Sequence, residues 1–260
     1  MKANKLSKML PNHRSITRPA YYTVKSLKKK VAKLDEEKWF QYNTKLRYLC
    51  QKLKYRSPPK PLKLIWVRPS EVDNKTRIGS KKDGLGQIKG GDWKIESAKN
   101  TRSYIGLKQR FKRGDKWRET EYINLVSEKI KENGELNGYT SVEEFINIRC
   151  EYIDNLYENI KYNGYEPNFK RKPKFPHRDK RNNRYIQQLE PIVAIGPSGE
   201  IYWRDGFHRY TIASLLDIEI PVNVIVRHKK WQQTRDLVGT GYVPTSVDLS
   251  HPDLKDVSIK

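Results

Sequence analysis

The chain has 260 residues, with 53 Lys or Arg against 30 Asp or Glu, and its formal net charge is +23. Its length allows one or two domains, and no segment approaches the roughly 20 apolar residues of a membrane-spanning helix. The N-terminus is lysine-rich without an apolar stretch, which argues against a secretory signal. The two cysteines, Cys50 and Cys150, suit neither a disulfide framework nor a zinc site. We therefore expect an intracellular, cytoplasmic protein.

The positive charge is concentrated in two segments. Residues 1–60 contain 17 Lys or Arg and 3 Asp or Glu, and residues 161–184 contain 9 and 2, so together they carry +21 of the net charge. Concentrated positive charge attracts phosphate backbones and other polyanions, although it can also serve only as a solvated surface. The residues that we expect to contact DNA or another polyanion are Lys28, Lys29, Lys30, Lys170, Arg171, Lys172, Arg178, Arg181 and Arg184.

Residues 1–60 are predicted to form a basic helical arm. Apolar residues recur at three- and four-residue steps from Val24 to Leu34 and again from Trp39 to Leu53. Prolines at 58 and 59 end the pattern. We expect the apolar stripe to pack on the body of the protein, rather than to lie in a membrane surface, and we expect both cysteines to be buried on apolar helix faces.

The next part of the chain alternates turns and helices. Residues 62–67 read as a strand, residues 77–93 are glycine-rich and typical of turns, and two helices are expected over 117–132 and 141–162. The second helix has a hydroxyl cap at Thr140-Ser141 followed by acidic residues, and Asn163-Gly164 ends it.

A long basic loop, residues 166–184, precedes a compact alternating unit. Strands are expected over 191–195, 200–203 and 220–226, with a helix over 207–216 between the last two and a final helix over 228–238. Residues 239–260 show little periodicity and are predicted to be an extended, peripheral tail. The sequence therefore predicts an α/β (α+β) protein whose core spans 61–238, with an insertion at about 81–140.

One segment, Asp205-Gly206-Phe207-His208-Arg209, combines residues that suit phosphate binding. Two cationic side chains in the first turn of a helix oppose the helix dipole unless an anion lies there. The free amides of a helix N-terminus, an imidazole and a guanidinium can together bind one phosphate. Asp205 can orient the cations or hold Mg²⁺ between phosphates. The alternative is that Asp205 caps the helix and pairs with Arg209, and the local sequence does not choose between the two.

This segment and its surroundings resemble the ParB/sulfiredoxin superfamily. The resemblance rests on residues 189–193, 201–203, the Gly-x-His-Arg motif of 206–209 and Ile220-Pro221-Val222, together with the helix before them. It covers about residues 62–80 and 145–227, and it implies a small mixed sheet with helices that binds a nucleoside di- or triphosphate with Mg²⁺. It assigns phosphate binding to Gly206, His208, Arg209 and the following Thr211. Catalytic roles would fall to Asp205, His208 and an acidic residue after the first strand, Glu71 or Asp73.

The chain also departs from members of that superfamily. Phe207 stands where sulfiredoxins have their reactive cysteine, so sulfinic acid reduction is not expected. Only 34 residues follow Val226, which leaves no room for the DNA-reading and dimerisation domains of partition proteins. Glu190 stands where partition proteins usually have glutamine. The segment Gly90-Gly91-Asp92-Trp93 in the insertion could form a lid or simply pack.

We therefore expect a nucleotide-binding protein that hydrolyses a nucleotide or transfers its phosphate. The alternatives are a ParB-like nuclease or other DNA-binding protein that uses the basic segments, and a scaffold of the same fold without catalysis.

Overall fold

The computed structural model describes residues 36–168 and 189–258. Among these residues, seven strands form one mixed sheet. Six of them follow the order β1-β7-β5-β6-β2-β4, and β3 pairs with the last residues of β7. The strands are β1 (Ile65–Val67), β2 (Asn74–Thr76), β3 (Gln87–Lys89), β4 (Ile95–Ser97), β5 (Ile192–Ile195), β6 (Ile201–Asp205) and β7 (Ile220–His228). The sheet combines parallel pairs, such as β5 with β7, and antiparallel pairs, such as β5 with β6. The expected α+β class is confirmed.

Strand β7 is the centre of the sheet. All nine of its residues are buried, and a near-continuous apolar run of this kind is typical of a strand covered on both faces. Its first residues pair with β1, its last residues pair with β3, and β5 lies along its other edge. The three-residue strands β2, β3 and β4 were not predicted.

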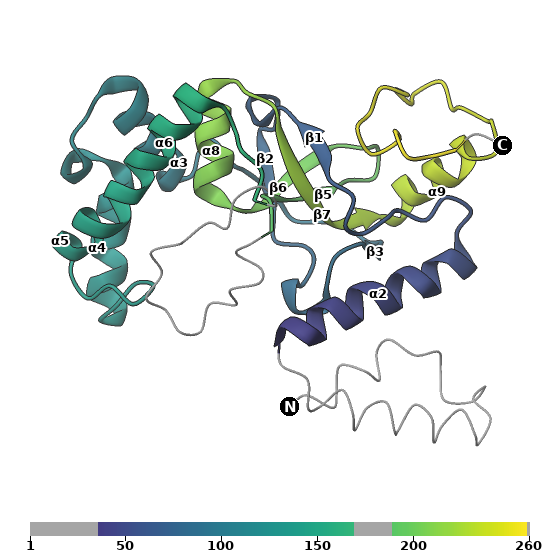
Figure 1. Cartoon of the computed structure of the whole chain (residues 1–260), viewed down its shortest axis with the longest axis horizontal. Helices are drawn as coiled ribbons and strands as arrows, with labels where there is room; N and C mark the ends of the chain where they lie inside the picture. Colours follow the sequence, from purple (N-terminus) through teal and green to yellow (C-terminus); the bar gives the residue numbers. More distant parts are fainter. Residues whose placement is uncertain (1–35, 169–188, 259–260) are drawn as a thin grey trace, which may run out of the picture.

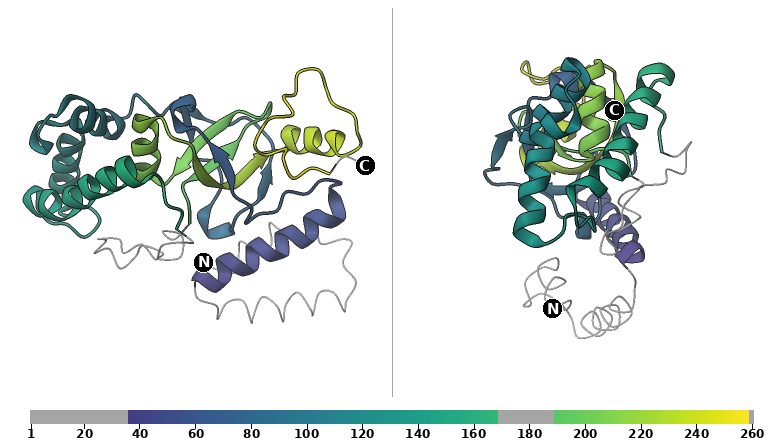
Figure 2. Two further views of the ribbon diagram at one scale, coloured as in Figure 1. Left: turned by 45° about the horizontal axis from the view of Figure 1, so that its top comes forward. Right: turned by 90° about the vertical axis from the view of Figure 1, so that its left-hand side faces the viewer.

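Helices cover the sheet at both ends (Figure 1). At one end lie α3 (Arg102–Lys108), η4 (Gln109–Arg113), η5 (Trp117–Glu119), α4 (Glu121–Asn133), α5 (Val142–Glu144), η6 (Phe145–Cys150) and α6 (Glu151–Asn163). At the other end lie α2 (Glu36–Lys54) and α9 (Lys229–Val238), and Figure 2 shows both ends from two further directions. The 3₁₀ helices η2 (Pro69–Glu71) and η3 (Lys81–Asp83) lie in connections.

The caps expected from the sequence are present. The Ser141 hydroxyl accepts the amide of Glu144, and α6 ends at Asn163 with Gly164 at its C-cap. The helix predicted over 117–132 is η5 followed by α4, and the one over 141–162 is continuous from α5 to α6 with a π-helical stretch at η6.

Helix α8 (Phe207–Leu216) lies between the sheet and the layer of helices α3–α6 (Figure 1). Its Ile212 and Leu215 belong to the apolar cluster of those helices, whereas Tyr210 and Ala213 pack into the cluster of the sheet. This helix therefore joins the two halves of the core, and its N-terminus carries the Gly-x-His-Arg motif.

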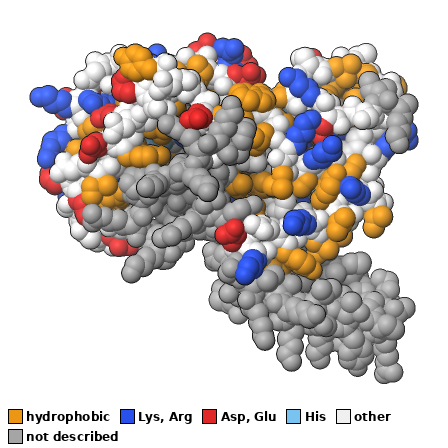
Figure 3. All heavy atoms as spheres, viewed as in Figure 1, with side chains coloured by type: hydrophobic (Ala, Val, Ile, Leu, Met, Phe, Trp, Pro, Cys, Tyr) orange, Lys and Arg blue, Asp and Glu red, His pale blue; other side chains and the backbone are white. Residues whose placement is uncertain are grey.

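The apolar stripe of α2 does not pack on the body as expected. The opposite face of the helix is buried, where Thr44 and Gln51 hydrogen bond to backbone groups of Leu85 and Gly86. Leu49 and Leu53 are 58% and 92% exposed, and Figure 3 shows hydrophobic side chains with Lys and Arg along this helix. Cys50 is exposed and only Cys150 is buried, so the expectation of two buried thiols is wrong for Cys50. The helical pattern before residue 36 lies outside the described residues.

Two further segments have a definite place. Trp93 packs edge-on against Tyr202 and His228, with ring centroids 6.5 and 5.2 Å away. The tail after α9 contains turns but no helix or strand within its described part, yet Asp253 and Leu254 are buried at 2% and 4% exposure. It is thus anchored in the core and differs from the peripheral tail that we expected.

No helix in the described ranges is long and apolar enough to cross a bilayer.

Candidate functional site

The turn between β6 and α8 requires glycine. Gly206 has φ +83°, a left-handed conformation, and a Cβ at this position would lie 2.7 Å from the Cα of Pro191. Gly206 is also the N-cap of α8, and no side chain caps the helix there. The first amides of a helix have no partner within the helix. The N-terminus of α8 therefore offers amide donors and a positive dipole end to an acceptor such as phosphate.

Asp205 binds two groups at this turn. Its Oδ1 accepts the Gly206 amide at 2.8 Å, and its Oδ2 forms an ion pair with the ammonium of Lys81 on η3. Burial, followed by the nearby charge of Arg204, lowers the pKa of Lys81 to about 8. The alternative in which Asp205 caps the helix and pairs with Arg209 holds only in part. Asp205 bonds the amide at the turn, but the cation that it pairs with is Lys81 and not Arg209.

Further positive charge surrounds the same turn. The guanidinium of Arg204 donates to the carbonyl oxygens of Ile78 and Gly79 at 3.1 and 3.3 Å. Burial and then the charge of Arg77 lower the pKa of Arg204. Burial is the larger cause of both lowered pKa values, and a neighbouring cation adds to it in each case. Sequence reasoning missed Lys81 and Arg204, because only the tertiary structure brings η3 beside β6.

His208 points into the helical layer. Arginine can only donate, so Arg149 Nη2 donates to Nδ1 of His208 at 3.1 Å. The remaining ring nitrogen, Nε2, then donates to the Tyr122 hydroxyl at 2.9 Å. Burial raises the pKa of Tyr122 well above its usual range, which keeps this hydroxyl neutral. With both ring nitrogens engaged, His208 positions α8 against η6 and α4 and does not present a free nitrogen to a phosphate.

Arg209 is engaged by a buried carboxylate. Its Nη1 donates to Glu190 Oε2 and to the Tyr165 hydroxyl, both at 3.3 Å, and its Nη2 donates to the Leu189 carbonyl at 2.7 Å. Glu190 is 4% exposed and also accepts the Asn168 amide and the Tyr165 hydroxyl. This network gives Glu190 the role that the sequence left open: it ties α8 to the segment that enters β5.

The other candidates lie away from the turn. Thr211 is fully buried, so it has no surface on which to touch a ligand. Glu71 is mostly exposed and pairs with Arg68, which in turn pairs with Asp217 at the C-terminal end of α8. A ten-residue helix is about 15 Å long, so the structure does not bring Glu71 to the turn at Gly206. Asp73 pairs with Lys99.

The candidate DNA-contacting residues at positions 28–30 and 170–184 lie outside the described residues.

Magnesium is the ion expected with a nucleotide. Within the described ranges no group of three or more His, Cys, Asp or Glu side chains is placed to hold a metal. Mg²⁺ bound with a nucleotide commonly uses one or two carboxylates, and phosphates and water supply the other oxygens. Asp205 fits that limited role as a carboxylate beside the helix N-terminus, where its oxygens now bind the Gly206 amide and the Lys81 ammonium.

No protein-family model, curated protein or solved structure matches this chain. The site is therefore interpreted from its own geometry and from the motif residues.

Proposed function

We propose that the chain binds the phosphates of a nucleotide at the N-terminus of α8. The observation that carries the proposal is the Lys81 ammonium, held by Asp205 beside an uncapped helix N-terminus at Gly206. The α8 amides and dipole favour an anion at this end of the helix, and the Lys81 ammonium lies at Asp205, the residue before the N-cap. Arg204 adds positive charge to the same turn.

Residue roles follow from the contacts. The α8 amides and Lys81 bind phosphate oxygens, and Gly206 lets the backbone approach them. Asp205 positions Lys81, and with Mg²⁺ bound it would be the carboxylate that holds the ion near the phosphates. His208 and Arg209 act indirectly, because their hydrogen bonds fix the helix against Arg149 and Glu190.

Hydrolysis of the nucleotide, or transfer of its phosphate, is the reaction class that we attach to this binding site. Asp205 is our candidate carboxylate for this reaction, because it bonds the Gly206 amide at the turn, whereas Glu71 lies at the far end of α8. CTP, ATP, ADP and GTP are titrated with and without MgCl₂, and the products of prolonged incubation are analysed. This panel decides the base and whether a reaction occurs.

The variant that tests the site is Lys81→Met, and Lys82→Met is its matched control because Lys82 is the exposed neighbour. A charge-assisted hydrogen bond contributes about 1.5–3 kcal/mol, so the Lys81 variant should bind a nucleotide at least roughly tenfold more weakly. The control should bind as the wild type does. Arg209→Ala is a poor test, because it leaves the buried Glu190 without its cation.

The protonation of Lys81 adds a second readout. Its pKa of about 8 means that the ammonium is present at pH 7 and mostly lost at pH 9. Nucleotide affinity should therefore fall between pH 7 and pH 9 in the wild type and stay level in Lys81→Met. Absence of saturable binding by every nucleotide, or equal affinity of both proteins, would overturn the proposal and favour a scaffold without a ligand.

DNA binding is the second candidate function, and one observation favours it. Residues 1–60 have a net charge of +14, and within them α2 exposes Lys45, Lys52 and Lys54. Several phosphate contacts should make DNA affinity fall by about 10³–10⁵ between 50 and 200 mM salt. Binding that does not change with salt, or no binding at low salt, would refute this candidate.

A further inference from the structure

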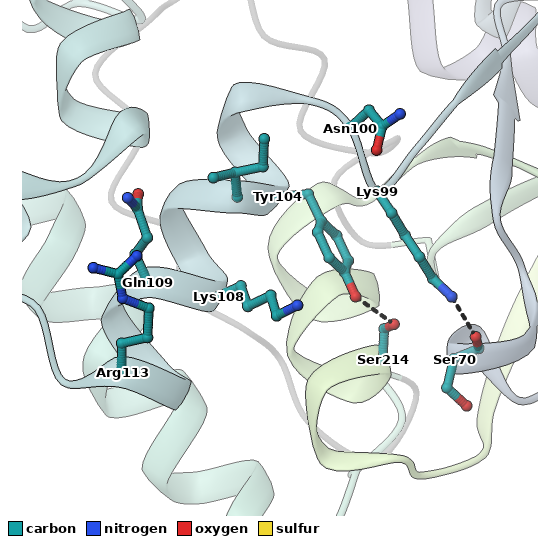
Figure 4. A pocket seen from close by; sticks show the side chains of 9 residues that line it. Ser70, Lys99, Asn100, Tyr104, Lys108, Gln109, Arg113 and Ser214 are labelled. Carbon is teal, nitrogen blue, oxygen red and sulfur yellow. Dashed lines mark hydrogen bonds between the residues drawn. The ribbon is translucent and has the colours of Figure 1, made fainter.

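A cavity of about 620 Å³ opens beside the C-terminal half of α8 (Figure 4). Residues of η2, α3, η4 and α8 line it, so it lies at the opposite end of α8 from Gly206. Its charged side chains are Lys99, Lys108 and Arg113, and no carboxylate is among the described residues that line it. A volume of this size is typical of small-molecule sites.

The three cations are held to different degrees. Lys99 donates to the Ser70 carbonyl at 2.7 Å and pairs with Asp73, and Arg113 pairs with Asp115 at 3.2 Å. Lys108 is exposed and has no ion-pair partner within the described part of the chain. In Figure 4 its ammonium extends toward the space between α3 and α8. Lys108 is therefore free to bind an anion, whereas Lys99 and Arg113 are already held by their ion pairs with Asp73 and Asp115.

Hydroxyl groups provide the donors at the α8 wall. The Tyr104 hydroxyl and Ser214 Oγ are 3.1 Å apart and point toward each other in Figure 4. One of the two donates in this bond, so the proton of the other is available to an acceptor in the cavity.

A buried hydroxyl lies one helical turn before Ser214. Tyr210 is 2% exposed, and its hydroxyl has no hydrogen-bond partner among the described residues. Burial and then the nearby Tyr104 and Asp73 raise the pKa of Tyr210 far above its usual range, so this hydroxyl also remains a donor. Buried polar groups without partners are uncommon in proteins, but Tyr210 is not among the described residues that line the cavity.

We propose that this cavity is a second binding site, for a small organic anion that carries a phosphate or carboxylate group. Lys108 binds the anionic group, and the Tyr104–Ser214 pair donates a hydrogen bond to it, while Lys99 and Arg113 lie at the two sides of the cavity (Figure 4). The C-terminal end of a helix dipole is negative, so the cation without an ion pair among the described residues, Lys108, is what makes this end of α8 accept an anion. The site is separate from the α8 N-terminus, and the two proposals stand independently.

The test uses the full-length protein and calorimetric titration with inorganic phosphate, glycerol 3-phosphate and malonate. Lys108→Met removes the unpaired cation, and Lys112→Met is its matched control because Lys112 is exposed on η4 but does not line the cavity. We expect at least one probe to bind the wild type and to bind Lys108→Met at least roughly fivefold more weakly, since a hydrogen bond from a charged group is lost. Lys112→Met should match the wild type.

Further variants separate this cavity from the nucleotide site. Tyr104→Phe keeps the ring and removes one hydroxyl, and it should weaken the same probe while leaving the unfolding midpoint close to that of the wild type. Lys81→Met should leave probe binding unchanged. Stronger binding of glycerol 3-phosphate assigns the site to phosphates, and stronger binding of malonate assigns it to carboxylates.

Three results would overturn the second site: no saturable binding of any probe, equal binding by Lys108→Met and the wild type, or loss of probe binding in Lys81→Met alone.

Discussion

The substitution Asp253→Asn should destabilise the protein strongly, although Asp253 lies in a tail without helix or strand. Its carboxylate is buried and accepts hydrogen bonds from Arg227 at 2.5–3.0 Å and from the Trp231 indole at 2.9 Å. Arg235 also pairs with it at 3.2 Å, and both guanidiniums are at most 3% exposed. Removing the carboxylate leaves the buried Arg227 without the acidic partner described for it, whereas Arg235 keeps Asp256 at 2.9 Å.

The size of the effect follows from the pKa of Asp253 and from the burial of its partners. Burial alone would raise this pKa, but Arg227 and Arg235 outweigh burial and lower it from 3.8 to about 2. At 1.36 kcal/mol per pKa unit, the shift corresponds to about 2 kcal/mol of stability. Breaking a buried ion pair by removing one partner typically costs about 3–5 kcal/mol. We therefore expect Asp253→Asn to lower the free energy of unfolding by about 2–5 kcal/mol.

The same interaction fixes the direction of the pH dependence. The folded pKa lies below the unfolded one, so the stabilisation is fully present above pH 3.8 and is lost as the pH falls through about 2. The wild type should lose this contribution over that window, and Asp253→Asn should not.

Urea unfolding at pH 7 measures the difference in free energy, and thermal unfolding should show a midpoint lower by roughly 6–12 °C for a loss near 3 kcal/mol. Asp248→Asn is the control, because Asp248 is in the same tail and its exposed carboxylate accepts hydrogen bonds from Ser250. A loss below about 1 kcal/mol for Asp253→Asn, or an equal loss in the control, would refute the reasoning.

Two further predictions concern packing and thiol reactivity. Gly106→Ala should destabilise the protein by about 1–3 kcal/mol in urea unfolding, because a Cβ there would lie 2.3 Å from the backbone nitrogen of Tyr122. Helix propensity alone predicts that alanine stabilises the helix. A stabilised variant would therefore show that α3 and α4 do not pack so closely. Gly90→Ala, where a Cβ has no neighbour closer than 3.8 Å, is the control. A thiol reagent should label the exposed Cys50 quickly in the native protein and Cys150 only after unfolding, since burial raises the pKa of Cys150 to about 12; rapid labelling of both thiols would contradict this.

Local sequence patterns predicted the longer elements well. The helix expected over 207–216 is α8, and the strands expected over 191–195, 200–203 and 220–226 are β5, β6 and β7 with small changes at their ends. These segments have clear periodicity and recognisable turns, both of which depend on neighbours in the sequence. The strands β2, β3 and β4 have three residues each, which is too short for a periodic signal.

The direction of an amphipathic face was harder to predict than the helix itself. The stripe from Trp39 to Leu53 has helical spacing, and α2 is a helix, but the buried face contains the polar Asn43, Thr44 and Gln51. This face lies against the glycine-rich segment, whose backbone groups form hydrogen bonds with the polar side chains. Gln51, for example, donates to the Gly86 carbonyl. An apolar stripe thus predicted the helix but not which side of it faces the sheet.

The sequence by itself determined the concentration of positive charge, the α+β class and the position of the glycine turn that begins α8. Only the tertiary structure decided what each side chain near that turn does. His208 bonds to Tyr122, 86 residues away, Arg209 closes on the buried Glu190, and Lys81 reaches Asp205 from a different connection. The physical reason is that backbone conformation follows from adjacent residues, whereas ion pairs and buried hydrogen bonds form between groups that meet only when the sheet and helices pack.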